Sequence, residues 1–112
     1  MLYFVKYFYF CYSAEDMKKQ ETYCPITQVA ELLSDRWTML VLYQLNRGAK
    51  RFCDLERALD GISTRTLTLK LKRLAEQGLV IKNTDGLYET TEQGRGLKLV
   101  ENAMRRYEAK YL

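Results

Sequence analysis

The feature that most constrains the fold of this sequence is a helical pattern that leads directly into a hairpin pattern. After Ser63, a residue type favoured at helix N-termini, three leucines recur at the spacing of one helix face. They are Leu67, Leu71 and Leu74. The helical pattern ends at Gly78, and the residues 79–81 and 87–90 then flank the turn sequence Asn83-Thr84-Asp85-Gly86. We therefore predict a helix followed at once by a two-stranded β-hairpin.

Three further helices are predicted before this segment. The first begins at Pro25, since proline fits the first turn of a helix, and its apolar stripe starts at Ile26. The second runs from Arg36 to Asn46 after the capping pair Ser34-Asp35 and is apolar on most sides, which predicts a buried central helix. The third is short and carries one apolar face. That face consists of Phe52, Leu55 and Leu59.

A last helix is predicted from near Thr91 to the end of the chain. Its apolar stripe is spaced by three and four residues. The stripe consists of Leu97, Val100, Met104, Tyr107 and Tyr111. Two helices joined by a tight turn and followed by a hairpin describe a winged helix-turn-helix. We therefore predict a mainly α fold with a small β-hairpin, in the α+β class.

The length of 112 residues suits a single domain, which we place over residues 17–112, with terminal helices that dimerise. The aromatic run at the N-terminus is too short to span a membrane. It also lacks the basic region and small-residue cleavage site of a signal peptide. We interpret residues 1–16 as an extension from an over-extended gene prediction, with Met17 as the native start. The alternative is an arm that packs on a dimer partner.

The composition argues against an enzyme. Histidine is absent, which removes the usual general base near neutral pH and the commonest zinc ligand. The chain also has no Gly-rich phosphate loop and no paired-carboxylate constellation. We expect no catalytic activity, no cofactor and no metal. Cysteines stand at Cys11, Cys24 and Cys53 without a CxxC pair, which fits a reducing cytoplasm better than a disulfide framework.

The predicted helix after Ser63 carries cations and no acidic residue from position 63 to 75, within a chain of net charge +4. With the leucines inward, helical geometry points Arg65, Thr68, Leu69 and Lys72 outward. Arginine can bond both acceptors of a guanine edge, and threonine or leucine can meet a thymine methyl group. We expect residues near the helix start to read bases and the later cations to bind phosphates.

Ten residues are thus predicted to contact double-stranded DNA. They are Ser63, Thr64, Arg65, Thr68, Leu69, Lys70, Lys72 and Arg73, with Arg51 and Lys82 as flanking backbone contacts. The alternative is a solvated basic face on an ordinary helix. The position of the helix, after a helix-turn and before a hairpin, favours DNA.

The apolar stripe of the last helix is too large to be left in water, which predicts a homodimer. The predicted interface consists of Ile26, Leu97, Val100, Met104, Tyr107 and Tyr111. A two-fold dimer would place two reading helices on successive major grooves, roughly 34 Å apart. The alternative is that the stripe folds back onto its own domain.

An ordered series of residues from about 22 to 112 carries a family resemblance. The series is Cys24-Pro25, Asp35-Arg36-Trp37-Thr38 with Leu40, Arg47-Gly48, RFCDLERALDGIS (51–63), Leu67-Thr68, Leu71, Leu74, Glu76-Gln77-Gly78-Leu79-Val80 and Thr91-Glu92-Gln93-Gly94. With it the sequence resembles the HxlR-type winged-helix regulators, a branch related to MarR proteins. The resemblance implies homodimeric transcription factors, repressors or activators, that bind inverted-repeat operators and dimerise through their terminal helices. The hairpin turn is shorter here, which weakens the expectation of contacts from it.

The resemblance also implies a sensing role for Cys24. In several members of such families, the cysteine before the first helix reacts with a small electrophile or oxidant. A helix N-terminus lowers the pKa of a thiol and favours the reactive thiolate, so the chemistry permits this role. The alternative is an inert, partly buried cysteine. Cys53 is either a resolving partner across the dimer or merely a small side chain.

The sequence thus predicts a cytoplasmic regulator that binds double-stranded DNA as a homodimer on an inverted repeat and does not associate with membranes. Two alternatives remain open. One is a thiol-based redox protein acting through Cys24. The other is a winged-helix module that binds proteins and not DNA.

Overall fold

The computed structural model describes residues 24–33 and 35–112, and the chain divides into two compact units, residues 1–34 and 35–112. Residues 1–16, including Cys11, lie outside the described residues, so the interpretation of this segment stays a prediction. In the first unit, helix α3 spans Pro25–Leu32, with Cys24 as its N-cap and proline in its first turn. Both Ile26 and Val29 of α3 are exposed to solvent.

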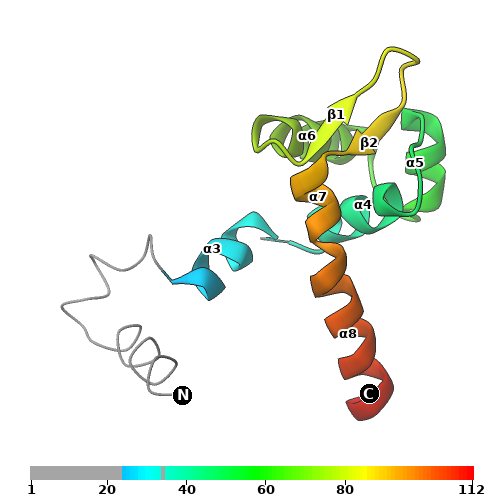
Figure 1. Cartoon of the computed structure of the whole chain (residues 1–112). Helices are drawn as coiled ribbons and strands as arrows, with labels where there is room; N and C mark the ends of the chain where they lie inside the picture. Colours follow the sequence, from blue (N-terminus) through cyan, green and yellow to red (C-terminus); the bar gives the residue numbers. More distant parts are fainter. Residues whose placement is uncertain (1–23, 34) are drawn as a thin grey trace. The chain divides into compact units, whose positions relative to one another are not determined.

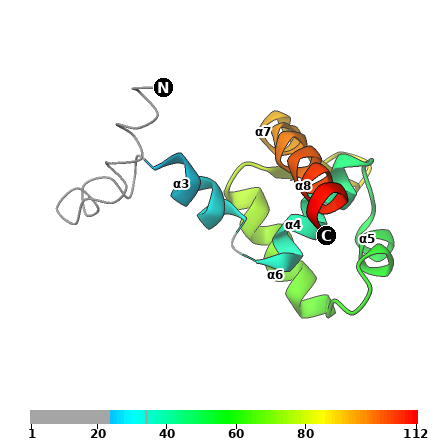
Figure 2. The same cartoon turned by 90° about the horizontal axis from the view of Figure 1, so that it is seen from below.

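The second unit is built around helix α4, Arg36–Asn46, which packs against α5, α6, β2, α7 and α8. Its start is capped by Asp35, whose Oδ1 accepts a 2.8 Å hydrogen bond from the Thr38 N–H. One side of α4 is fully buried. The buried residues are Thr38, Val41, Leu42 and Leu45. The predicted bounds and central place of this helix are confirmed (Figures 1 and 2).

Helices α5, Phe52–Ala58, and α6, Thr64–Glu76, form the helix-turn-helix. Ser63 caps α6 by accepting a 3.1 Å hydrogen bond at Oγ from the Thr66 N–H. The three leucines predicted to face inward from α6 are buried, as are Leu55 and Leu59 beside them. The predicted fold class, mainly helical with a winged helix-turn-helix, is confirmed.

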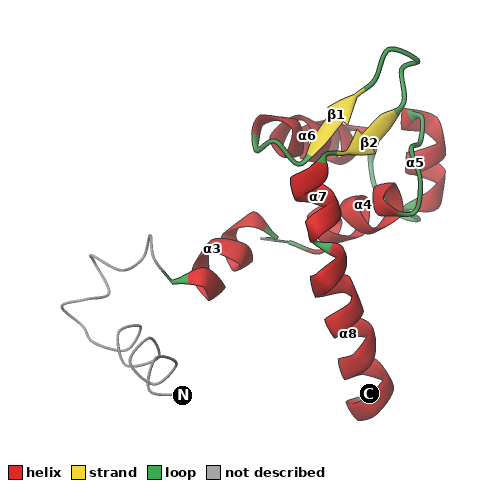
Figure 3. Cartoon of the chain, viewed as in Figure 1, coloured by secondary structure: helices red, strands yellow, loops and turns green. Residues whose placement is uncertain are grey.

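Strands β1, Val80–Lys82, and β2, Tyr88–Thr90, form an antiparallel hairpin in which Val80 pairs with Thr90. The Oδ1 atom of Asn83 closes the turn by accepting hydrogen bonds from the N–H groups of Asp85, at 2.9 Å, and Leu87, at 3.0 Å. On its other side, Tyr88 exchanges backbone hydrogen bonds with Lys50, in the segment between α4 and α5. Figure 3 shows the hairpin projecting from the helices.

The end of the chain holds two helices, so the prediction of one continuous helix from Thr91 is wrong. Helix α7 spans Glu92–Gly96, and helix α8 spans Lys98–Tyr111. At the break, the Leu97 N–H bonds to the Gly94 carbonyl three residues back, at 3.2 Å, and the Leu97 side chain is buried. Two glycines in α7 weaken its helical preference, and burial of Leu97 stabilises the break.

Helix α7 lies very close to the base of the hairpin. A Cβ atom added at Gly94 would stand 2.3 Å from the Leu79 carbonyl oxygen and 3.0 Å from the Thr90 Cβ. That carbonyl accepts a 2.9 Å hydrogen bond from the Thr91 N–H, and the Thr91 hydroxyl donates a 2.6 Å hydrogen bond to the Gly78 carbonyl. The absence of a side chain at Gly94 therefore allows this contact.

Candidate nucleic-acid interface

One face of α6 is open to solvent along the helix. The residues predicted to point outward are all exposed, and Leu69 is an unusual apolar member of this face, with 54% of its surface accessible. The exposed set is Thr64, Arg65, Thr68, Leu69, Lys72 and Arg73. The predicted orientation of α6 is therefore confirmed, and contact of these residues with DNA stays a prediction.

The hydroxyl groups at the start of α6 donate their hydrogens to acceptors within the protein. Thr64 donates its hydroxyl hydrogen to Glu56 Oε2 on α5 at 2.6 Å, and Thr68 donates to the Thr64 carbonyl at 2.8 Å. The Ser63 hydroxyl donates to Thr66 Oγ1 at 2.8 Å. Since each hydrogen is used internally, Thr64 and Thr68 offer a base an acceptor lone pair and a methyl group, and Arg65 supplies the donors.

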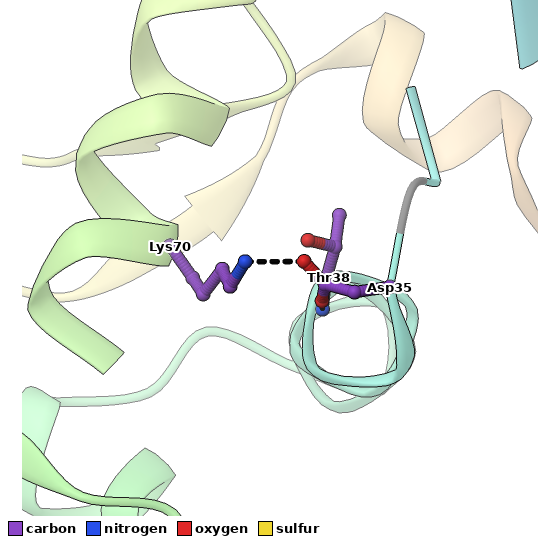
Figure 4. A network of polar contacts seen from close by, with 3 residues as sticks. All are labelled: Asp35, Thr38 and Lys70. Atoms are coloured by element: carbon purple, nitrogen blue, oxygen red, sulfur yellow. Dashed lines mark hydrogen bonds and ion pairs between the residues drawn. The ribbon is translucent and has the colours of Figure 1, made fainter. Parts of the chain in front are cut away.

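The structure removes Lys70 from this set. Its ammonium group forms a hydrogen-bonded ion pair with Asp35 Oδ2, at the N-terminus of α4, and its side chain is only 22% exposed (Figure 4). The prediction that Lys70 binds a DNA phosphate is therefore corrected. The long lysine side chain leaves α6 sideways and reaches a carboxylate 35 residues earlier in the sequence. The pair ties α6 to α4.

The Asp35 carboxyl has a lowered pKa. Burial raises this pKa, but hydrogen bonds from Lys70 and Thr38 together outweigh burial and bring the pKa below 3.8. Because the folded-state pKa lies below the unfolded value, ionised Asp35 stabilises the fold at higher pH. That stabilisation is lost as the pH falls through the lowered folded-state pKa.

For the variant Asp35→Asn, we expect a lower free energy of unfolding than for the wild type at pH 7. The difference should close progressively below pH 3.8, where the carboxyl takes up its proton. Urea titrations from pH 7 to pH 2.5 measure it. In a Lys70→Met background the same substitution should show a weaker pH dependence, because the main partner of the carboxylate is gone. A difference that widens on acidification would contradict the assignment.

The flanking cations are available on the surface. Arg51 is exposed at the N-cap of α5. Lys82, at the end of β1, is exposed as well, and its Nζ lies 5.5 Å from the centroid of the Tyr88 ring. Their predicted contacts with the DNA backbone stay predictions.

The predicted dimer residues differ in their exposure. Leu97 is buried within its own unit, so it belongs to the domain core and its assignment to an interface is corrected. Val100 is half-buried. Beyond its first turn α8 is exposed at every residue from 102 to 111. Met104, Tyr107 and Tyr111 are 52%, 59% and 63% exposed.

The two cysteines predicted to take part in sensing belong to different units of the chain. Cys24 is half-buried at the N-cap of α3 in the first unit, and Cys53 is exposed in the first turn of α5 in the second unit. Reactivity of either thiol stays a prediction.

Sequence analysis missed a cluster of polar side chains between α4 and α8, which we call the α4–α8 junction. It consists of Tyr43, Asn46, Glu101 and Arg105. The Arg105 guanidinium lies 5.4 Å from the Tyr43 ring centroid, and its hydrogen bond, helped by the charge of Arg47, lowers the pKa of the Tyr43 phenol. No local pattern marks these residues, because they come together only in the folded chain. Glu56 was missed for the same reason.

Within the described part of the chain, no helix has the length and apolar character needed to cross a membrane. In the same residues no group of three or more metal-ligating side chains gathers.

The chain is similar to known regulators. The family described as HxlR-like helix-turn-helix matches residues 32–112. An HTH-type transcriptional regulator of Synechocystis sp. is 36% identical over 95 residues, which cover 80% of this chain and 70% of that relative. The quinone-bound structure of YodB from B. subtilis superposes with a TM-score of 0.72 at 28% identity, covering 77% of this chain and 97% of YodB. The redox regulator HypR in its oxidized form superposes with a TM-score of 0.65 at 26% identity, covering 80% of this chain and 98% of HypR.

Proposed function

Because the chain belongs to the HxlR-like helix-turn-helix family and is an HTH-type transcriptional regulator, we propose that it binds an inverted-repeat operator in double-stranded DNA as a homodimer. The observation that carries the proposal is the open face of α6. This face combines Arg65, Lys72 and Arg73 with hydroxyl and apolar groups, and α6 itself carries no acidic residue up to position 75. Its composition suits a major groove.

Within this proposal, Arg65 reads a base and the cations about two turns later bind phosphates. Arg65 is the second residue of α6, and residues near the start of such a helix approach base edges. Lys72 and Arg73 lie closer to the C-terminal end of α6, where they contact DNA phosphates. These contacts contribute affinity and do not depend on the base sequence. Arg51 and Lys82 add further backbone contacts.

The proposed homodimer rests on the exposed side of α8. The ring centroids of Tyr107 and Tyr111 lie 5.0 Å apart. Beside the two rings is a surface hollow of about 430 Å³. The hollow is lined by Met104, Arg105, Tyr107, Glu108 and Leu112. So much aromatic surface on one exposed helix favours a symmetric contact with a second copy.

Selection of bound DNA from a random pool, at low ionic strength, tests the proposed function. We expect recovery of an inverted repeat whose half-sites are centred about one helical turn apart, roughly 34 Å. Binding should weaken steeply with salt, as phosphate contacts require. Absence of any DNA binding under these conditions would instead favour a protein-interaction module.

The dimer is tested by Tyr107→Glu. A carboxylate in an apolar interface loses its hydration without gaining a partner, so we expect the dimer to weaken by about 2 kcal/mol or more, roughly 30-fold in dissociation constant. Analytical ultracentrifugation measures the change. Ala109→Glu is the matched control, because it adds the same charge at an exposed position about 200° around α8 from Tyr107. Equal weakening by both variants would place the interface elsewhere.

A second candidate function, regulation by a small electrophile or oxidant at Cys24, is favoured by two observations. Cys24 is the N-cap of α3, and solved structures similar to this chain include quinone-bound YodB and oxidized HypR. We expect a quinone to abolish operator binding by the wild type but not by Cys24→Ser. Cys53→Ser separates the two thiols: if this variant alone resists the quinone, Cys53 and not Cys24 is the sensor. As a DNA-binding regulator the protein would act in the cytoplasm.

A further inference from the structure

Asn46, the last residue of α4, joins three helices through one amide group. Its Nδ2 atom donates a 2.9 Å hydrogen bond to Glu101 Oε1 on α8 and a 3.2 Å hydrogen bond to the Gly94 carbonyl on α7. The two acceptors lie on either side of the break at Leu97. The side chain of Asn46 therefore spans the point at which the direction of the C-terminal helix is set.

The buried part of α8 is confined to its first turn. Glu101 is only 7% exposed, whereas every later residue of α8 is exposed. A buried carboxylate is costly unless it is hydrogen-bonded, and an apolar side chain would fill the same space without that requirement. The polar contact is directional, so it constrains the angle at which α8 leaves the domain. The Arg105 guanidinium, over the Tyr43 ring, adds a second contact one turn later.

The opposite end of α4 holds α6. There, Lys70 of α6 forms its ion pair with Asp35, the N-cap of α4. One rigid helix of 11 residues thus carries a fixed attachment to α6 at one end and to α8 at the other. Figure 1 shows α8 extending from the body of this unit, with α6 on the far side of α4.

Because α8 is long, a small change in the angle at which it leaves the domain moves its far end by a distance comparable to one base pair. Its 14 residues span about 20 Å along the helix axis. A rotation of about 10° at the first turn would move its far end by about 3.5 Å, close to the 3.4 Å rise of one base pair. In a two-fold dimer both protomers contribute to this shift.

We propose that Asn46 and Glu101 are positioning residues that set the separation of the two α6 helices in the dimer, and therefore the spacer length between the operator half-sites. The inference rests on the proposed function. It assigns to the α4–α8 junction a role in operator selection, although none of its residues touches a base.

The test uses the full chain and the inverted repeat recovered from the random pool. Affinities are measured for duplexes whose spacer is shortened or lengthened by one or two base pairs, and for an isolated half-site. For the wild type we expect one spacer to exceed its neighbours by more than tenfold. For Asn46→Ala this preference should fall below threefold, while the half-site affinity and the dimer mass stay unchanged.

Three further variants sharpen the test. Glu101→Gln keeps an acceptor oxygen for Asn46 and should keep the wild-type spacer profile. Lys98→Ala, a substitution at an exposed position in the same turn of α8 as Glu101, should also keep it. Arg105→Ala removes the second contact and should broaden the profile at an unchanged dimer mass, which separates this effect from the place of Arg105 beside the proposed interface. The inference therefore stays testable if Asn46→Ala does not fold.

A wild-type profile in both Asn46→Ala and Arg105→Ala would overturn the inference. So would a loss of full-site affinity that merely follows a loss of half-site affinity. If the wild type binds half-sites with no spacer preference, DNA binding stands and the positioning role fails. If it binds no DNA at all, the proposed function itself fails.

Discussion

Replacing Gly94 by alanine is expected to lower the free energy of unfolding by about 3 kcal/mol, the upper end for overpacking a tight contact. The added Cβ would stand 2.3 Å from the Leu79 carbonyl oxygen, a backbone atom that cannot rotate away. Relief requires α7 to move from the hairpin, which also strains the hydrogen bond from Thr91 to that carbonyl. For a domain of this size the melting temperature should fall by roughly 15 °C. Thermal and urea denaturation at fixed protein concentration measure both quantities.

Gly96 provides the matched control for this substitution. It lies in the same short helix, and a Cβ atom there meets no atom within 4 Å. Alanine is favoured over glycine in helices by about 1 kcal/mol, so Gly96→Ala should leave stability unchanged or raise it. If both substitutions destabilise the protein equally, α7 as a whole is sensitive and the close approach at Gly94 is not the cause.

Replacing Arg65 by alanine is expected to weaken operator binding by about 1–3 kcal/mol, or roughly 5- to 150-fold. The reason is the loss of a side chain that can bond two acceptors of one guanine, at a place where the neighbouring threonine hydroxyls have already donated their hydrogens inside the protein. Specificity should relax at one base pair in each half-site. Competition binding with operators substituted position by position measures both effects.

Lys72→Ala is expected to change DNA binding in a different way from Arg65→Ala. If Lys72 binds a phosphate, its loss weakens binding to all sequences alike and reduces the slope of affinity against salt by about one. Arg65→Ala should instead leave binding to random DNA much less affected than binding to the operator. Equal losses on operator and random DNA would remove the base-reading role from Arg65.

The parts of the fold that were predictable are those with local chemical signals. Asp35 and Ser63 cap α4 and α6 through their own side chains, and the bounds of α4 agree with the prediction. The outward face of α6 was predictable as well, because its three buried leucines fix the helix orientation.

Two features were not predictable because they depend on contacts between distant segments. The charge of Lys70 looks like that of its neighbours, and only the folded chain brings it to Asp35. The break at Leu97 is hidden because the apolar spacing continues from Leu97 to Tyr111 without interruption, although the first of these residues is in the core and the last is in solvent. Periodicity reports a face of a helix and does not report what that face contacts.

The hairpin is held at its base and closed at its tip by separate contacts. The base is secured by Thr91, and Lys50 pairs with Tyr88 at the turn end of β2. The turn itself is closed by the side chain and the backbone of Asn83, which bond to residues 85–87. No residue from 83 to 86 belongs to the core, so the turn can be replaced by another sequence without loss of core packing. A longer loop rich in arginine, grafted between Lys82 and Leu87, would give the protein a minor-groove probe while leaving its folding unit intact.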